Sequence, residues 1–93
     1  MITLKRLPFG KVRVTFSLEK DQPPGTTSVV GCFNDWRPGS HVLRRRSNGR
    51  KSASVTLPEG SVVSFRYLSE GGRWTDDPAV PDRDHDGNNR LSV

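Results

Sequence analysis

Apolar and polar residues alternate along most of this 93-residue chain. From Val12 to Leu18 every second residue is valine, phenylalanine or leucine, and the residues between them are Arg13, Thr15 and Ser17. Successive side chains of a β-strand point to opposite faces, so this period of two predicts a strand with one buried face. No interval carries apolar residues spaced for a long amphipathic helix. We therefore expect an all-β protein.

Turn signals divide the chain into six to eight short antiparallel strands. The expected strands cover residues 12–18, 27–33, 41–46, 52–57, 63–68, 73–75 and 90–93. The clearest turn signal is Asn48-Gly49, because Asn-Gly between two extended runs favours a tight β-hairpin. Residues 76–87 hold two prolines, five aspartates and one glycine, and we expect a loop there. Short strands with turns at this spacing are typical of an immunoglobulin-like β-sandwich.

The length of the chain predicts a single domain over residues 1–93, with residues 1–10 as an N-terminal arm. No apolar run is long enough for a membrane-spanning helix or a secretory signal. Cys32 is the only cysteine, so it has no partner for an internal disulfide. These features predict a cytoplasmic location.

The segment from Gly31 to Trp36 reads G-x-F-N-x-W and resembles a motif of family-48 carbohydrate-binding modules. These are the isoamylase N-terminal-like early-set domains, which include the glycogen-binding domain of the AMP-activated protein kinase beta subunit. Further stretches are similar to the family in order and spacing: residues 57–60, 65–67, 74–78 and 87–89. The resemblance covers residues 11–93, and the basic opening of the chain is similar to short stand-alone bacterial members.

The resemblance implies an early-set sandwich that binds an α-glucan, either glycogen or a maltooligosaccharide, without a cofactor. In glycan-binding members two tryptophans stack on the sugar, and they match Trp36 and Trp74. A basic residue between them matches Arg66, and an asparagine of the last motif matches Asn88. The counterpart of an apolar loop residue of the kinase subunit falls near Asp84, so that contact is missing here.

The chemistry of these side chains agrees with a sugar ligand. A flat indole can cover the C–H face of a pyranose, burying about 150–250 Å². Guanidinium and carboxamide groups suit hydroxyls, because the first donates several hydrogen bonds and the second both donates and accepts. The alternative is that both tryptophans pack as structural residues, as most aromatic side chains do.

Three other residues of the first motif are expected to be structural. We expect Gly31 and Phe33 on the inner face of their strand and Asn34 in the turn that presents Trp36, because Asn side chains often bond nearby backbone. The family's aromatic residue that begins the following strand is replaced near Lys51, which puts core packing there in question.

The net charge is +5, and residues 1–66 hold 12 Lys and Arg against 4 Asp and Glu. Five of the cations surround one hairpin, at Arg44, Arg45, Arg46, Arg50 and Lys51. Alternation prevents the three consecutive arginines from sharing one surface. We interpret the hairpin as a solvated edge that discourages strand pairing, and do not expect nucleic acid as a partner, although a phosphate-contacting patch stays an alternative.

Asp82, Asp84 and Asp86 spell D-x-D-x-D-G with Gly87, the opening of many calcium loops. The twelfth position is Val93 instead of Glu, so an EF-hand is excluded. We expect a solvated acidic loop without metal, and the three aspartates are only a minor calcium candidate.

No arrangement of residues predicts catalysis. His41, His85 and Cys32 are isolated in the sequence, and the neighbours Asp76 and Asp77 would point to opposite sides of an extended segment. We therefore predict a non-enzymatic glucan-binding module. The alternatives are an early-set module that has lost the sugar and docks on a glucan-metabolising enzyme or kinase-like protein, and a nucleic-acid binder with a basic surface.

Overall fold

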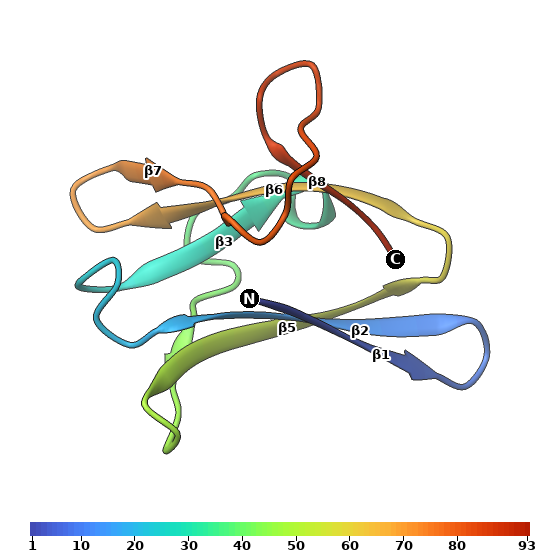
Figure 1. The fold of residues 1–93 in the computed structure, drawn as a ribbon, viewed down its shortest axis with the longest axis horizontal. Helices are drawn as coiled ribbons and strands as arrows, with labels where there is room; N and C mark the ends of the chain where they lie inside the picture. Colours follow the sequence, from blue (N-terminus) through green and yellow to red (C-terminus); the bar gives the residue numbers. More distant parts are fainter.

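The computed structural model describes all residues from 1 to 93 and consists of two antiparallel β-sheets packed face to face (Figure 1). The expected all-β sandwich is confirmed. The only helical segment is a 3₁₀ helix of three residues, Cys32–Asn34, so no helix of this structure could cross a membrane.

The first sheet, sheet A, is the lower layer of Figure 1. Its strands follow the order β1 (Ile2–Leu7), β2 (Lys11–Glu19), β5 (Arg50–Pro58) and β4 (Arg44–Arg45). The expectation of an N-terminal arm at residues 1–10 is wrong, because β1 forms a hairpin with β2 and pairs along its whole length. Apolar and polar residues alternate only weakly in Ile2–Leu7, so the sequence did not reveal this strand. It lies at the edge of the sheet and pairs with one neighbouring strand.

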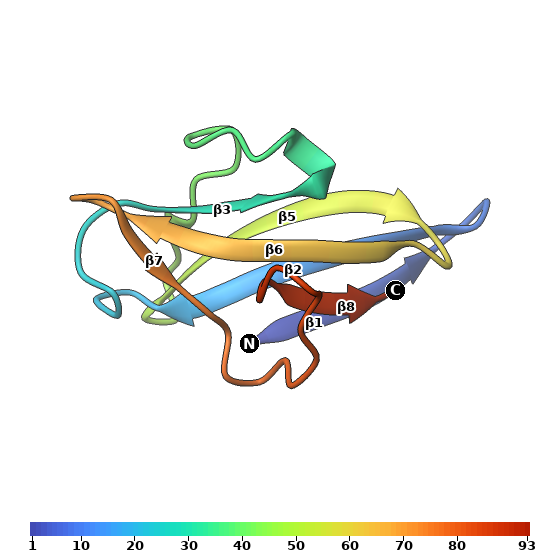
Figure 2. The same cartoon turned by 90° about the horizontal axis from the view of Figure 1, so that it is seen from above.

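The second sheet, sheet B, has β6 (Val62–Ser69) at its centre. On one side β6 pairs with β3 (Thr27–Gly31). On the other side its two halves pair with β8 (Asn89–Ser92) and β7 (Arg73–Thr75). Seen from above in Figure 2, β6 lies between β3 and the pair β7 and β8.

The core lies between the sheets and is built from the alternating apolar residues. Phe16 of β2 is fully buried and contacts the rings of Phe65 and Tyr67 from β6, with centroid separations of 4.9 and 6.5 Å. The buried apolar residues of this core are Val12, Val14, Phe16, Val29, Leu43, Ala53, Val55, Val63, Phe65, Tyr67 and Val80. Removing apolar surface of this kind from water is the main stabilising contribution in so small a domain.

The expected strand at residues 41–46 is instead a crossing between the two sheets. Val42 forms an isolated bridge with Ser28 of sheet B, and Leu43 enters the core. Arg44 and Arg45 then pair with β5 of sheet A. Residues 41–46, which look like one strand in the sequence, therefore pair with both sheets.

Lys51 is buried between the sheets, although it had been counted with the basic hairpin. Its Nζ donates to the backbone carbonyl oxygens of Pro23 and Gly25 at 2.6 and 3.3 Å, and to Oγ1 of Thr27 at 2.9 Å. Burial lowers the pKa of the Lys51 ammonium, the nearby Arg45 charge lowers it further, and Asp21 opposes them. An ammonium with three acceptors thus closes this end of the sandwich.

Candidate functional site

The first candidate motif begins where β3 ends against β6. A side chain at Gly31 would place its Cβ 2.4 Å from the carbonyl oxygen of Ser64, so only glycine allows this approach. Phe33 lies in the 3₁₀ helix, not in a strand, yet its ring stacks on Phe16 at 5.7 Å. Its inward direction was therefore predicted correctly, while its backbone conformation was not.

Asn34 ties this turn together. Its Oδ1 accepts from the backbone N–H of Gly31 at 3.0 Å, and its Nδ2 donates to the carbonyl oxygen of Val29 at 3.1 Å. Nδ2 also lies 3.0 Å from Nδ1 of His41. These bonds reach back to β3, so the amide fixes the turn from which the next residues leave the sheet.

Trp36 leaves this turn with an unusual backbone. Asp35 and Trp36 both have left-handed conformations, with φ of 55° and 57°. This region is unfavourable for a bulky side chain and persists only where the surrounding bonds impose it. The N–H of Trp36 donates to the carbonyl oxygen of Gly31 at 3.0 Å, and the indole is partly buried.

Trp74 and Arg66 lie on the outer face of sheet B. Phe65 and Tyr67 point into the core, so Arg66 and Leu68 point outward. Trp74 pairs with Leu68 across the sheet and is 49% exposed. Along β6, Arg66 therefore lies between Phe65, which pairs with Gly31 of β3, and Leu68, which pairs with Trp74 of β7. In Figure 2 the segment containing Trp36 lies on the β3 side of β6, opposite β7.

The guanidinium of Arg66 is held by the loop that connects β7 and β8. Its Nη2 donates to the carbonyl oxygen of Gly87 at 2.8 Å, and its Nε lies 3.4 Å from Oδ1 of Asp76. Nε is buried and has no well-aligned acceptor, and Nη1 has no partner in the chain. The side chain is 32% exposed, so part of this donor group remains accessible to a ligand.

Asn88 follows Gly87 and is bound to Asp84. The backbone N–H and the Nδ2 of Asn88 donate to the two Asp84 carboxylate oxygens at 2.9 and 3.1 Å. Partial desolvation would raise the pKa of Asp84, but the bonds from Asn88, Ser64 and Asp86 outweigh it and lower the pKa to about 2. Asn88 therefore stands beside Arg66 with its amide direction fixed and its Oδ1 without a partner in the chain.

The three alternating aspartates of this loop do not converge on one point. Asp84 accepts bonds from the loop itself, and no group of three or more His, Cys, Asp or Glu side chains comes together anywhere in the chain. The loop geometry therefore gives the Asp82, Asp84 and Asp86 calcium candidate no support.

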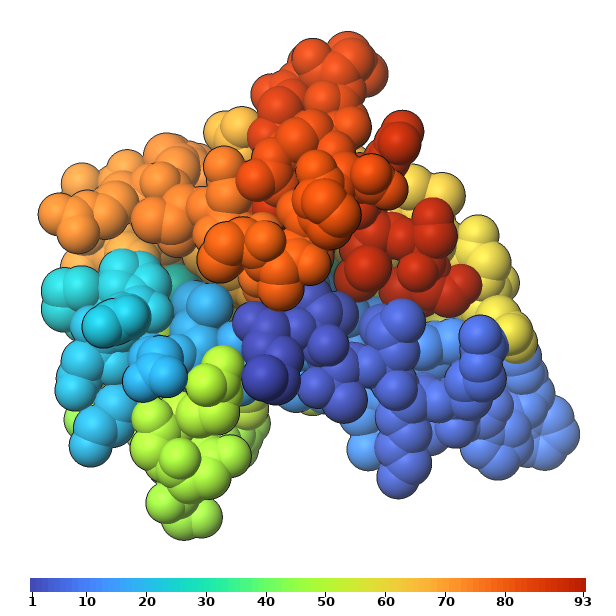
Figure 3. Space-filling model, viewed as in Figure 1, coloured from blue at the N-terminus to red at the C-terminus, as the bar shows by residue number.

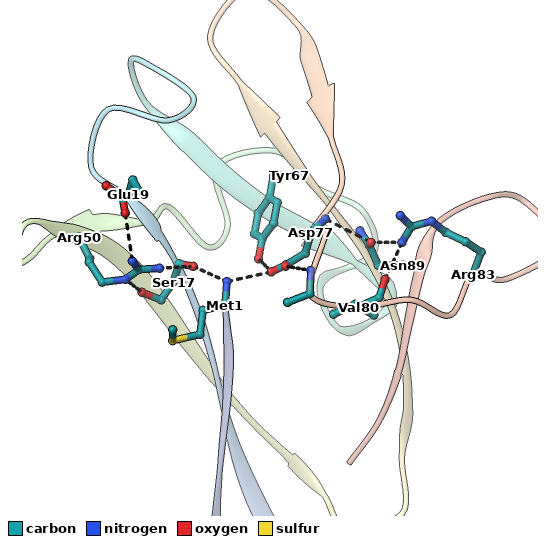
Figure 4. Close-up of polar contacts among 10 residues, drawn as sticks. Met1, Ser17, Glu19, Arg50, Tyr67, Asp77, Val80, Arg83 and Asn89 are labelled. Atoms are coloured by element: carbon teal, nitrogen blue, oxygen red, sulfur yellow. Dashed lines mark hydrogen bonds and ion pairs between the residues drawn. The ribbon is translucent and has the colours of Figure 1, made fainter.

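A buried polar network beneath the loop was not predicted from the sequence (Figure 4). Asp77 is 1% exposed; its Oδ2 accepts from the Tyr67 hydroxyl at 2.8 Å and from the Met1 ammonium at 3.2 Å. Burial would raise the pKa of Asp77, but these donors and the Ala79 N–H lower it overall, while burial and the Asp77 contact raise the pKa of Tyr67. The network joins the start of the loop to both sheets.

The end of the loop is anchored by Asn89, which is fully buried. Its Oδ1 accepts from the Asp77 N–H at 3.2 Å and from Nη1 of Arg83, and its Nδ2 donates to the carbonyl oxygen of Phe65 at 3.0 Å. Arg83 also donates to the Val80 carbonyl oxygen at 3.1 Å. The sequence signal for this anchor was the adjacent pair Asn88 and Asn89. Consecutive side chains point in opposite directions, so one amide is buried while the other is accessible.

No model of a known protein family matches this chain, and none of the curated proteins is similar to it. The relation to family-48 modules therefore stays a prediction carried by the motifs themselves. Trp74 and Arg66 lie on the outer side of sheet B, the loop that carries Asn88 contacts Arg66 there, and the turn that carries Trp36 follows the end of β3 at the edge of the same sheet. We call this group the tryptophan face.

Proposed function

We propose that the chain binds an α-glucan, glycogen or a maltooligosaccharide, on the tryptophan face and releases it unchanged. The observation that carries the proposal is Trp74, a large apolar ring that is 49% exposed on the outer face of sheet B that also carries Arg66. An indole in this setting gains little from packing but offers a flat surface to a sugar ring.

The polar partners of the ring support a hydroxylated ligand. Arg66 is fixed through the Gly87 carbonyl and Asp76, which leaves Nη1 as an oriented donor. Asn88 offers an acceptor next to it, because its Nδ2 is already bound to Asp84. A fixed donor and acceptor lower the entropy cost of ordering these side chains when a ligand binds.

The left-handed conformation of Trp36 also supports the proposal. Two successive non-glycine residues with positive φ are costly, typically about 1–3 kcal/mol each. The Asn34 bonds to Gly31 and Val29 hold the turn in which these two residues lie. Strain of this kind is concentrated at sites that hold a ligand.

The proposal includes no reaction. Glycoside hydrolysis generally uses two carboxyl groups on either side of one bond. Asp76 turns outward to Arg66 and Arg83, at 3.4 and 3.9 Å, whereas Asp77 is buried against Tyr67. We place this function in the cytoplasm, because Cys32 is an exposed free thiol that a reducing compartment preserves.

The test is titration of the protein with maltoheptaose, followed by tryptophan fluorescence and calorimetry, and retention in gels containing glycogen. We expect affinity between micromolar and millimolar, since a few hydrogen bonds and two stacked rings give no more. Trp74→Ala should weaken binding about tenfold or more. Phe9→Ala is the matched control, because Phe9 is 98% exposed on a distant hairpin.

Trp36→Ala should weaken binding similarly, with circular dichroism and thermal unfolding showing that the partly buried position is still folded. Absence of binding by the folded wild type at about 10 mM maltoheptaose, a free energy of only about 3 kcal/mol, would refute the proposal. An equal loss in Phe9→Ala and Trp74→Ala would also contradict it.

One observation favours docking on another protein as a second candidate function. An apolar groove opens between β1 and β8, the outer strands of the two sheets, and Leu4 on its rim is 46% exposed. The groove is lined by Met1, Ile2, Leu4, Ala79, Val80, Pro81 and Leu91, and on its polar side by Asp82, Arg90 and Ser92. A glucan-metabolising enzyme or kinase-like protein that shields this groove would leave the tryptophan face open.

A further inference from the structure

The outer face of sheet A carries six cationic side chains drawn from all four strands and the β4–β5 turn. Val12, Val14 and Phe16 of β2 point into the core, so Lys11 and Arg13 point outward. The register places Lys5 opposite Arg13 and Arg44 opposite Ser52 on that same side. We call this set the cationic face: Lys5, Lys11, Arg13, Arg44, Arg46 and Arg50.

Two of these arginines are fixed against the sheet by hydroxyl groups. Arg46 Nε donates to Oγ of Ser52 at 2.9 Å, and Arg50 Nε donates to Oγ of Ser17 at 2.7 Å. Ser17 and Ser52 face each other across β2 and β5. The expected alternation of the three consecutive arginines is confirmed, because Arg45 points away and lies 3.7 Å from Asp21.

The cationic face has almost no counter-charge. Glu19 is the only acidic residue that forms an ion pair with it, 3.7 Å from Arg50, and the other five cations take part in no ion pair. Lys5 and Arg13 lie directly opposite each other, an arrangement of like charges that destabilises a sheet. An anion bound between them would relieve this repulsion.

The shape of the surface suits an extended ligand. Figure 3 shows a hollow on the lower edge of the molecule, between the yellow-green lobe of the β4–β5 hairpin and the blue lobe of the β1–β2 hairpin. At the base of the first lobe, a polar pocket is lined by Ser40, Arg44, Arg46, Ser52 and Ser54. Cations and hydroxyl donors therefore line this pocket.

We propose that the cationic face binds a nucleic-acid duplex through its phosphodiester backbone. From Lys11 to Ser17 the face extends about 20 Å, the length of roughly six phosphates along one strand of a duplex. Lys, Arg, Ser and Thr are the side chains that bond phosphate oxygens. None of the outward residues of the four strands is aromatic, and the one exposed ring near them, Phe9, lies in the β1–β2 turn, so the face has no row of rings for base stacking, which distinguishes it from single-strand binding surfaces.

The binding is independent of sequence, because side chains that contact only the phosphodiester backbone read no base edges. A neutral glucan gains nothing from these charges, so this site is separate from the tryptophan face. Lysines and arginines that neutralise phosphates release counterions, which makes salt dependence the diagnostic property.

The test measures fluorescence anisotropy of a labelled 20-base-pair DNA duplex of mixed sequence, from 50 to 200 mM KCl. With about five phosphates neutralised, log K should fall against log salt with a slope of about −4 to −5, or about 500-fold over this range. Arg44→Ala should reduce the slope by about 0.9 and weaken binding about three- to tenfold. The matched control is Arg45→Ala, the neighbouring residue on the opposite side, which should change neither quantity.

Further measurements distinguish duplex binding from binding of other ligands. Trp74→Ala should leave duplex binding unchanged, and a single strand of the same sequence should bind more weakly than the duplex. The proposal is overturned if Arg45→Ala weakens binding as much as Arg44→Ala, if the wild type binds no duplex at 50 mM KCl, or if the single strand binds more tightly. It is also overturned if only phosphatidylserine vesicles retain the protein and Phe9→Ser abolishes that retention.

Discussion

The two outer faces of this sandwich differ in whether their cationic side chains have acidic partners. On sheet B the guanidinium of Arg66 is held by Asp76 and by a carbonyl oxygen of the acidic loop. On sheet A Arg46 and Arg50 donate to serine hydroxyls, and five of the six cations face water without an acidic partner. The net charge of +5 is therefore a property of one face more than of the whole molecule.

This difference separates what each face can bind. A compensated cation beside an exposed indole offers directed hydrogen bonds and a flat apolar surface, which suits an uncharged hydroxylated ligand. Uncompensated cations on a flat sheet offer a strong field with little shape selectivity, which suits a polyanion. One thin domain can thus carry two unrelated binding surfaces, because its two sheets need only their inner faces for folding.

The largest expected effect tests how closely the tryptophan face is packed on its sheet. Gly31→Ala would place a Cβ 2.4 Å from the Ser64 carbonyl oxygen and should lower the free energy of unfolding by about 2–4 kcal/mol. Gly10→Ala, in the hairpin of the cationic face, meets no atom within 4 Å and should cost only about 1 kcal/mol for its positive φ. Urea unfolding of both variants makes the comparison, and equal losses would contradict the close packing described for β3.

A second effect distinguishes the buried cation of sheet A from those of the cationic face. Lys51→Ala leaves three oxygen acceptors of the sandwich end without their donor and should cost about 2–3 kcal/mol. Arg45→Ala, its neighbour in the β4–β5 register, loses only an exposed ion pair and should cost less than about 1 kcal/mol. Thermal unfolding should therefore rank the two variants clearly, and duplex binding should be unchanged in each.

Most strands of the two sheets, although not β1, could be predicted from local patterns, because alternation and turn residues act over a few positions. The predicted strands beginning at Val12, Ser52 and Val63 agree with β2, β5 and β6 to within two residues at each end. The inward direction of Phe33 and the opposite directions of Arg44 and Arg45 followed from the same period.

The contacts that position the loop of sheet B could not be predicted, because they join distant parts of the chain. Asp77 meets Tyr67 and Met1, which lie 10 and 76 positions away, and nothing local marks it as buried. Lys51 falls on the inward-facing side of β5 in the alternation of that strand, although a charged side chain favours the surface. The left-handed backbone of Trp36 was also hidden, since it is imposed by Asn34 and not by a glycine.

A smaller effect is expected from acid, and it is confined to sheet B. The folded loop lowers the pKa of Asp84 to about 2, whereas the unfolded chain titrates near about 3.9. Between these values the unfolded chain binds more protons, so the contribution of Asp84 is complete above about pH 4 and is lost as the pH falls towards 2. Urea midpoints at pH 6, 4 and 3 should therefore decline.

Asp84→Asn should flatten part of that decline, since the titrating group with the low pKa is gone. Asp82→Asn is the control, because its carboxylate accepts no hydrogen bond in the chain. A decline of the same size in wild type and in Asp84→Asn would assign the acid sensitivity to other groups, with Asp77 the next to test, since its pKa is also lowered.

The smallest expected effect is the coupling between the two faces, which should be close to zero. The faces belong to different sheets, and the rigid packing of Phe16, Phe65 and Tyr67 lies between them. A ligand changes a second site only if it prefers one of two states of the protein, and no strand is shared by the two sheets. Saturating duplex should therefore change the maltoheptaose dissociation constant by less than twofold, a coupling below about 0.4 kcal/mol.

Calorimetric titration of maltoheptaose with and without the duplex at 50 mM KCl measures this coupling, with Arg44→Ala as the control that removes the effect of the duplex. A fivefold change in the wild type would mean that the ligands compete for one surface, and the separation of a tryptophan face from a cationic face would then be wrong.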